Sequence, residues 1–169
     1  AGEDTRPTAD RIRESVFNIL SARVWDAEVL DLFGGTGAMA LEALSRGAEH
    51  AVIVDSGREA IRAIERNSQS VLKDAMPERV KILRADYRAA IDAMRDVRFD
   101  LVFLDPPYRM ADAYADALTR LCARGLLGEN CICLLERAAD AQISLPDGFE
   151  RYDTRTYGGT SVEFVREAR

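Results

Sequence analysis

Four consecutive residues, Asp105-Pro106-Pro107-Tyr108, follow directly after the apolar segment 99–104. Each proline restricts its own φ and disfavours helix at the residue before it, so the four residues predict a rigid, extended corner at the end of a buried strand. The Asp105 carboxylate and the carbonyl groups can accept hydrogen bonds from an exocyclic amino group, and the Tyr108 ring can stack on the base that carries it. The tetrapeptide therefore predicts a site for the amino group of adenine, cytosine or guanine, in preference to a plain corner with a surface tyrosine.

A glycine-rich loop is the second chemical signal. Gly34, Gly35 and Gly37 follow the short apolar strand 28–33 and precede an alanine-rich helical pattern. Glycines let the backbone approach a ligand closely, and the start of the next helix offers free N–H groups. The segment 35–40 also fits the Gly-x-Gly-x-x-Gly/Ala pattern of dinucleotide-binding proteins, so the loop alone does not select one cofactor.

Acidic residues at strand ends narrow that choice. Asp31, Asp55 and Asp86 each close a predicted strand. Asp55, at the end of the second strand, is placed to accept hydrogen bonds from ribose hydroxyls. Asp86, at the end of the third strand, can accept a hydrogen bond from an adenine amino group. Each aspartate could instead cap a helix. Because the sequence shows no evident group that would bind the pyrophosphate of NAD, the pattern favours S-adenosylmethionine as the cofactor. The predicted cofactor-binding residues are Asp31, Phe33, Gly34, Gly35, Gly37, Asp55, Ser56, Asp86 and Tyr87.

The elements that must position these residues alternate along the chain. A helix is expected over 7–22, with Thr8 as a possible cap, and further helices over 37–46, 57–72, 87–95 and 111–123. Strands are expected over 28–33, 50–55, 80–85, 99–104 and 130–136, and then over 151–157 and 160–165 on either side of Gly158-Gly159. This order predicts an α/β, Rossmann-like fold: a doubly wound, mostly parallel seven-stranded sheet with a C-terminal antiparallel hairpin.

Taken together, these motifs resemble class I S-adenosylmethionine-dependent methyltransferases that act on amino groups. A closer resemblance is to the bacterial 16S ribosomal RNA (guanine-N2) methyltransferases. It is carried by the opening segment Thr5-Arg6-Pro7-Thr8 and by the distances along the chain from that segment to the helix, the glycine loop and the Asp-Pro-Pro-Tyr corner. The resemblance covers nearly the whole chain. It implies S-adenosylmethionine as the cofactor, a guanine amino group in the head of the small ribosomal subunit as the acceptor, and catalytic roles for Asp105, Pro106, Pro107 and Tyr108.

One departure concerns the beginning of the chain. Family members usually carry a basic segment before Thr-Arg-Pro-Thr, whereas only residues 1–4 precede it here, so we expect a trimmed single domain over 1–169. Counting 23 basic and 29 acidic residues gives a net charge of −6, which is unusual for an RNA-binding protein. The predicted RNA contacts are therefore local, and they are Arg6, Arg11, Arg13 and Arg109. Weak contact with naked RNA favours an assembled or partly assembled small subunit as substrate.

Composition bounds the remaining possibilities. The hydrophobic content of 47% excludes disorder, and no apolar stretch approaches the roughly 20 residues that span a bilayer. The three cysteines are expected to be buried and reduced, with Cys131 and Cys133 on opposite faces of one strand. A single histidine and no cluster with ligand spacing predict that no structural metal is bound. We expect a cytoplasmic monomer.

Other functions share parts of this pattern. DNA adenine methyltransferases carry the same tetrapeptide but generally need further sequence-reading elements, for which there is little room. An NAD-dependent oxidoreductase would share the loop and Asp55, and protein-glutamine methyltransferases usually have Asn at the position of Asp105. A non-catalytic RNA-binding or assembly module is a further alternative, which an intact Asp105 and Tyr108 disfavour.

Overall fold

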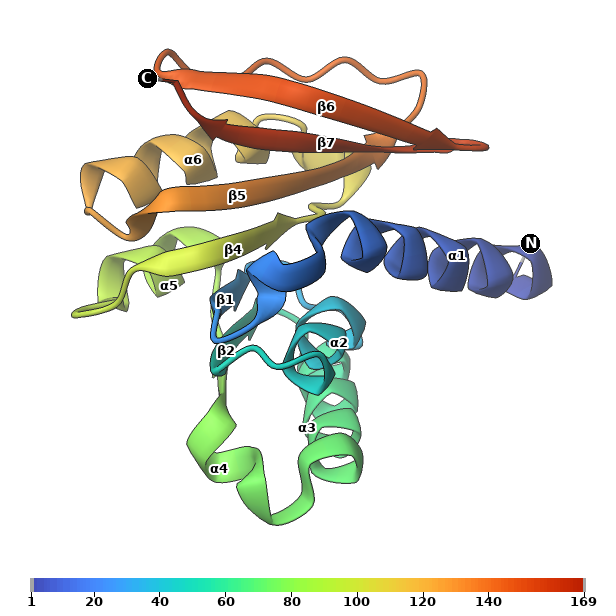
Figure 1. Cartoon of the computed structure of the whole chain (residues 1–169), viewed down its shortest axis with the longest axis vertical. Helices are drawn as coiled ribbons and strands as arrows, with labels where there is room; N and C mark the ends of the chain where they lie inside the picture. The colour runs from blue at the N-terminus through green and yellow to red at the C-terminus, as the bar shows by residue number, and fades with distance from the viewer. Residues whose placement is uncertain (1, 169) are drawn as a thin grey trace.

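A computed structural model describes the backbone of residues 2–168 and the side chains of residues 8–168. Seven strands form a single sheet in the order β3-β2-β1-β4-β5-β7-β6 (Figure 1). Their bounds are β1 Glu28–Asp31, β2 His50–Asp55, β3 Val80–Arg84, β4 Phe99–Leu104, β5 Leu127–Ala138, β6 Phe149–Tyr157 and β7 Thr160–Glu167. The first five strands are parallel, whereas β7 runs antiparallel to both of its neighbours. This is the predicted fold class.

Helices cover both faces of the sheet. They are α1 Gly2–Leu20, α2 Ala38–Ser45, α3 Arg58–Leu72, α4 Met76–Arg79, α5 Tyr87–Ala93 and α6 Ala113–Ala123. Buried side chains of α1, α2 and α3 pack on one face, and those of α5 and α6 pack on the other. The strands are buried on both sides, which explains why their sequences read as nearly continuous apolar runs.

The chain changes direction across the sheet between β1 and β4. Strands β1, β2 and β3 are added toward one edge, and β4 and β5 toward the other, so the two halves diverge at the β1/β4 pair. Ligands in open α/β sheets bind beyond the carboxyl ends of the strands at such a point. In Figure 1, helix α1 runs past this end of β4 and β5.

The last two strands form a hairpin, and the final strand lies inside the sheet. Tyr157 pairs with Thr160 across the two-residue turn Gly158-Gly159, and Gly158 has a φ of +60°, which favours glycine. Strand β7 then pairs with β5 as well as β6, so the edge of the sheet belongs to β6.

Several boundaries differ from those predicted. Helix α1 begins at Gly2 and passes through Pro7, so Thr8 lies inside the helix and the predicted cap is wrong. It is followed by the 3-10 turn η1 (Ser21–Val24). The 3-10 turn η2 (Lys73–Ala75) and α4 lie where no element was predicted. Among the described helices, none is long and apolar enough to cross a membrane.

The cysteines require two corrections. Cys131 and Cys133 are two residues apart on β5, so their side chains share one face and pack in the same core cluster. The prediction of opposite faces was therefore wrong. Cys122 is exposed near the end of α6, although it was expected to be buried, and all three cysteines are free.

Candidate active site

A cavity of about 560 Å³ opens at the carboxyl ends of β1, β4 and β5. The glycine loop forms one wall, α1 contributes Thr8, Ile12 and Arg13, and β7 contributes Thr160 and Val162. A volume of this size is within the range of small-molecule sites. The cavity therefore lies where the strand order changes direction and brings together segments from both ends of the chain.

The glycine loop is held in place by backbone bonds and by one carboxylate. The Gly34 N–H donates to the Val54 carbonyl at 2.8 Å, and the Gly35 N–H donates to Asp55 Oδ2 at 3.0 Å. Asp55 Oδ1 accepts from the Gly57 N–H at 2.9 Å, so this side chain connects the loop to the start of α3. A Cβ atom on Gly35 would meet no atom within 4 Å, which leaves open space beside the loop for a ligand.

Three acidic side chains point into the cavity from neighbouring strands. Asp31 pairs with Phe103 in the sheet register, and Asp105 follows two residues later on the same face. Glu136 pairs with Val162 of β7 and lies next to Asp105.

The pKa values of these three groups are all raised. Burial raises the pKa of Asp31 to about 7, with smaller contributions from the charges of Asp105 and Asp55. Burial, followed by the charge of Asp105, raises the pKa of Glu136 to about 8. Asp105 is open to solvent at the cavity mouth, yet the surrounding protein removes enough water to raise its pKa too. The site therefore holds protons at neutral pH that ordinary surface carboxylates would release.

The Asp-Pro-Pro-Tyr corner leaves β4 as predicted for a rigid turn. Pro106 is buried and Pro107 is exposed, and the Pro107 carbonyl accepts from the Met110 N–H at 2.8 Å. Tyr108 begins the 3-10 turn η3 (Tyr108–Met110) and is 95% exposed. Its ring is free of the core and can be covered by a planar partner.

Some of the predicted cofactor residues lie outside the cavity lining. Asp86 caps α5 by accepting from the Arg88 N–H at 2.9 Å, and its carboxylate also pairs with the Arg88 guanidinium at 3.0 Å. Tyr87 is buried, and its hydroxyl donates to Asp116 at 2.6 Å. Its ring lies 5.4 Å from that of Phe33, which does line the cavity. Gly37, Asp55 and Ser56 lie beside the cavity rather than in its lining.

The predicted RNA-binding arginines differ in environment. Arg11 and Arg109 are exposed, and Arg109 directly follows Tyr108. Arg13 is partly buried, lines the cavity, and pairs with Asp10 at 3.2 Å and with Glu42 at 3.5 Å. The side chain of Arg6 lies outside the described residues. Arg11 and Arg109 are therefore the described members of the set with the most accessible side chains.

Sequence reasoning missed Glu136 as a residue of the cavity. The signal was available, because Glu136 ends the apolar run of the fifth strand just as the aspartates end earlier strands. It was overlooked because the predicted strand 130–136 includes it as an ordinary strand residue. The contributions of Thr160 and Val162 could not have been read locally, since they depend on β7 pairing with β5.

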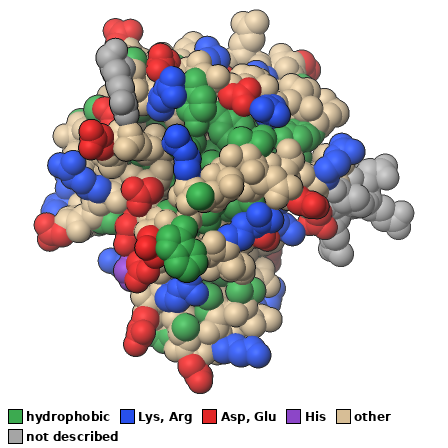
Figure 2. Space-filling model, viewed as in Figure 1, with side chains coloured by type: hydrophobic (Ala, Val, Ile, Leu, Met, Phe, Trp, Pro, Cys, Tyr) green, Lys and Arg blue, Asp and Glu red, His purple; other side chains and the backbone are tan. Residues whose placement is uncertain are grey.

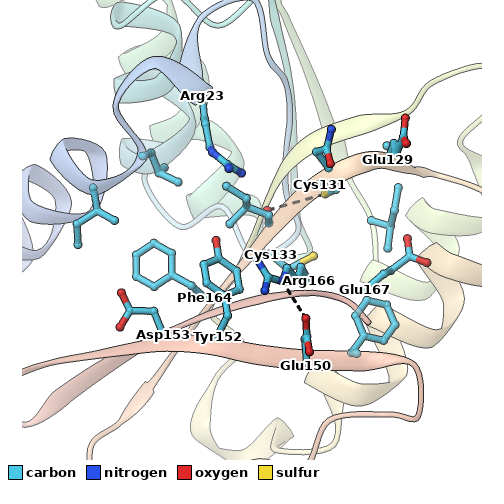
Figure 3. A pocket seen from close by; sticks show the side chains of 17 residues that line it. Arg23, Glu129, Cys131, Cys133, Glu150, Tyr152, Asp153, Phe164, Arg166 and Glu167 are labelled. Carbon is cyan, nitrogen blue, oxygen red and sulfur yellow. Dashed lines mark hydrogen bonds and ion pairs between the residues drawn. The ribbon is translucent and has the colours of Figure 1, made fainter. Parts of the chain in front are cut away.

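A second cavity of about 500 Å³ lies near the amino end of β5, at the opposite end of that strand (Figure 3). Arg166 lies over the Tyr152 ring at 4.4 Å and pairs with Glu150 at 2.9 Å. Figure 2 shows apolar side chains exposed in the upper part of the molecule, where β5, β6 and β7 lie, with charged groups around them. None of the predicted site residues whose side chains the structure describes lines this second cavity, so the chemical signals of the sequence converge on the first.

Comparison with known proteins agrees with this fold. The family model described as "Conserved hypothetical protein 95" matches residues 1–166. A relative from Escherichia coli (strain K12), named ribosomal RNA small subunit methyltransferase D, is 35% identical over 97% of this chain and 81% of its own length.

Solved structures agree as well. A conserved hypothetical protein from Streptococcus pyogenes is 31% identical, with a TM-score of 0.81 over 90% of this chain and 93% of its own. Magnesium protoporphyrin IX methyltransferase from Synechocystis PCC 6803 shares the fold alone, at 15% identity and a TM-score of 0.73 over 98% of this chain and 83% of its own. The resemblance predicted from the motifs is confirmed, and the chain belongs to the family described as "Conserved hypothetical protein 95".

Proposed function

We propose that this protein transfers a methyl group from S-adenosylmethionine to the exocyclic N2 amino group of a guanine in 16S ribosomal RNA. The observation that carries the proposal is the position of Asp105, at the mouth of a cavity walled by the glycine loop and beside an exposed Tyr108. Relatives named as small-subunit ribosomal RNA methyltransferases support the RNA as substrate.

The cavity has the features that the cofactor requires. Phe33, Gly34 and Gly35 would contact it along the loop, and Asp55, which already fixes that loop, would accept from ribose hydroxyls on its remaining lone pairs. Bound there, S-adenosylmethionine supplies an activated methyl group. The task left to the protein is to align the amine with that group and to exclude water.

The side chains of the corner would act on the amine itself. The nitrogen lone pair of guanine is delocalised into the ring, which makes the amino group a poor nucleophile. Hydrogen bonds from its protons to Asp105 and to the Pro106 carbonyl favour a pyramidal nitrogen and stabilise its developing positive charge. As the carbon–nitrogen bond forms, the carbon–sulfur bond breaks and the nitrogen loses one proton, to Asp105 or to solvent. The base reaches this point unstacked and held against Tyr108.

Labelled-methyl transfer to small subunits that lack the native modification tests the proposal, with primer extension to locate the product. Asp105→Ala should abolish transfer and leave cofactor affinity nearly unchanged. Tyr108→Phe should retain most of the activity that Tyr108→Ala loses, because stacking needs the ring and not the hydroxyl. Transfer to adenine in DNA, or cofactor binding without transfer to any nucleic acid, would instead support the alternatives of a DNA methyltransferase or an assembly module.

The form of the RNA is a separate part of the proposal. The net charge of −6 and a small number of exposed arginines around the cavity favour an assembled or partly assembled subunit over protein-free RNA. Arg11→Glu should slow methylation of particles, and Arg98→Glu, an exposed arginine at the opposite end of β4, is the matched control. Arg13 is a less direct probe because its side chain also lines the cavity. Equal turnover on protein-free 16S RNA would refute this part.

A further inference from the structure

Glu136 and Asp105 form a pair of carboxyl groups at the cavity. Leu104 pairs with Leu135 in the parallel register of β4 and β5, so the next residues along the two strands lie side by side. Both side chains line the cavity, and they lie close enough for a hydrogen bond between them to affect the pKa of each. Two ionised carboxylates offer no donor, so this contact requires one shared proton.

The environments of the two groups indicate which one holds the proton. Burial raises the pKa of Glu136 to about 8, and both the charge of Asp105 and the bond to it act in the same direction. Burial also raises the pKa of Asp105, but the bond from Glu136 lowers it. The bond between them raises the pKa of Glu136 and lowers that of Asp105, so Glu136 is the donor of the pair and Asp105 the acceptor. This division of roles is typical of close carboxyl pairs.

We propose that Glu136 is a positioning residue for methyl transfer, whose protonated carboxyl group donates to Asp105 and orients the ionised Asp105 carboxylate toward the target amine. This inference rests on the proposed function and goes beyond it, because the tetrapeptide alone contains no group that fixes the Asp105 side chain.

A test must distinguish the effect of Glu136 from the effects of the other charged or titratable groups around it. Asp31 faces it from β1, Arg13 faces the same cavity from α1, and the Tyr114 hydroxyl of α6 donates to the Glu136 backbone carbonyl. On β7 the facing residues are uncharged. Asp31 titrates close to neutral pH as well, but it is present in every Glu136 variant. A difference between variants therefore isolates Glu136.

Kinetics on the proposed substrate give the first test. Glu136→Ala should lower kcat about tenfold or more, with cofactor affinity changed by less than about twofold. Glu136→Gln, which still donates, should recover kcat to within about threefold at pH 7. Above pH 8 the wild-type pair loses its proton and kcat should fall, whereas Glu136→Gln should keep its rate. Glu129→Ala and Glu129→Gln, at an exposed position of the same strand, are the controls.

Carbon-13 NMR of protein labelled at the glutamate carboxyl carbon tests the pair without any reaction. One glutamate should titrate near pH 8, disappear in Glu136→Gln, and move to lower pH in Asp105→Asn, which removes the neighbouring charge. If the wild type is active but Glu136→Ala is equally active, or if Asp105→Asn leaves the titration unchanged, the positioning role is wrong. A wild type that methylates no ribosomal RNA would instead refute the proposed function, and the NMR result would still decide whether the proton is shared.

Discussion

Replacing Asp31 by Asn should stabilise the protein, and increasingly so as the pH rises. Asp31 is 4% exposed, and burial raises the pKa of its carboxyl group from 3.8 to about 7. The native state therefore keeps a proton that the unfolded chain releases above pH about 4. Because the native state binds more protons, the free energy of unfolding decreases as the pH rises from there through about 7. Above that range Asp31 is ionised inside the protein, and its full cost is present.

The magnitude follows from the displacement of the pKa. A tenfold change in acid dissociation corresponds to about 1.4 kcal/mol, so ionised Asp31 costs at most about 4 kcal/mol at pH 8. Water in the neighbouring cavity screens part of this, and we expect a gain of roughly 1 to 3 kcal/mol for Asp31→Asn. Asn is isosteric, and its side-chain oxygen can still accept the Phe33 N–H, which lies 3.3 Å from Asp31 Oδ1.

Urea unfolding followed by circular dichroism at pH 3, 5, 7 and 8 measures the effect. The two proteins should differ by less than about 0.5 kcal/mol at pH 3, where Asp31 is protonated in both the native and the unfolded state, and the difference should grow as the pH rises to about 7. Asp140→Asn, at an exposed position beyond the end of β5, should show no such divergence. A stability difference that is independent of pH, or a loss of stability at pH 8, would refute the reasoning.

Two further predictions concern packing and a buried charge. In Gly34→Ala the new Cβ would lie 2.5 Å from Ile53 Cγ2, so the free energy of unfolding, measured by thermal unfolding, should fall by roughly 1 to 3 kcal/mol. Gly159→Ala is the control, because its Cβ would meet no atom within 4 Å and its stability should not change. Glu163 is 1% exposed and pairs with two arginines, so Glu163→Gln should lower the free energy of unfolding in urea by about 3 kcal/mol. Glu150, which pairs with Arg166 at the surface, is the control, and Glu150→Gln should lower it by less than about 1 kcal/mol. Equal losses for variant and control in either case would contradict the argument.

The fold could be predicted because strand signals in this chain are local. Each central strand is a short apolar run that ends in an acidic residue or a glycine, and Gly158-Gly159 specifies a tight hairpin. The start of α1 could not be predicted in the same way. Proline normally marks the first turn of a helix, but here the helix continues toward the N-terminus past Pro7.

The site was less predictable than the fold because its residues depend on contacts between strands. Asp31 and Asp105 were found as strand ends, but their nearness to Glu136 follows from the register of β4 and β5. Asp86 was predicted to bind the cofactor, with a helix cap as the alternative. Its side chain caps α5 and pairs with Arg88, and its role toward a cofactor stays a prediction.

The position of β7 has a consequence for how the protein is made. This strand follows β6 in the chain, yet it fills the gap between β5 and β6 and supplies Thr160 and Val162 to the cavity. During synthesis, β5 therefore presents an unpaired edge until β7 has been made, and such edges readily pair with other chains. The cavity itself acquires the β7 wall only then. Termination before residue 160 would thus remove an interior strand, so such a chain should be prone to aggregation as well as inactive.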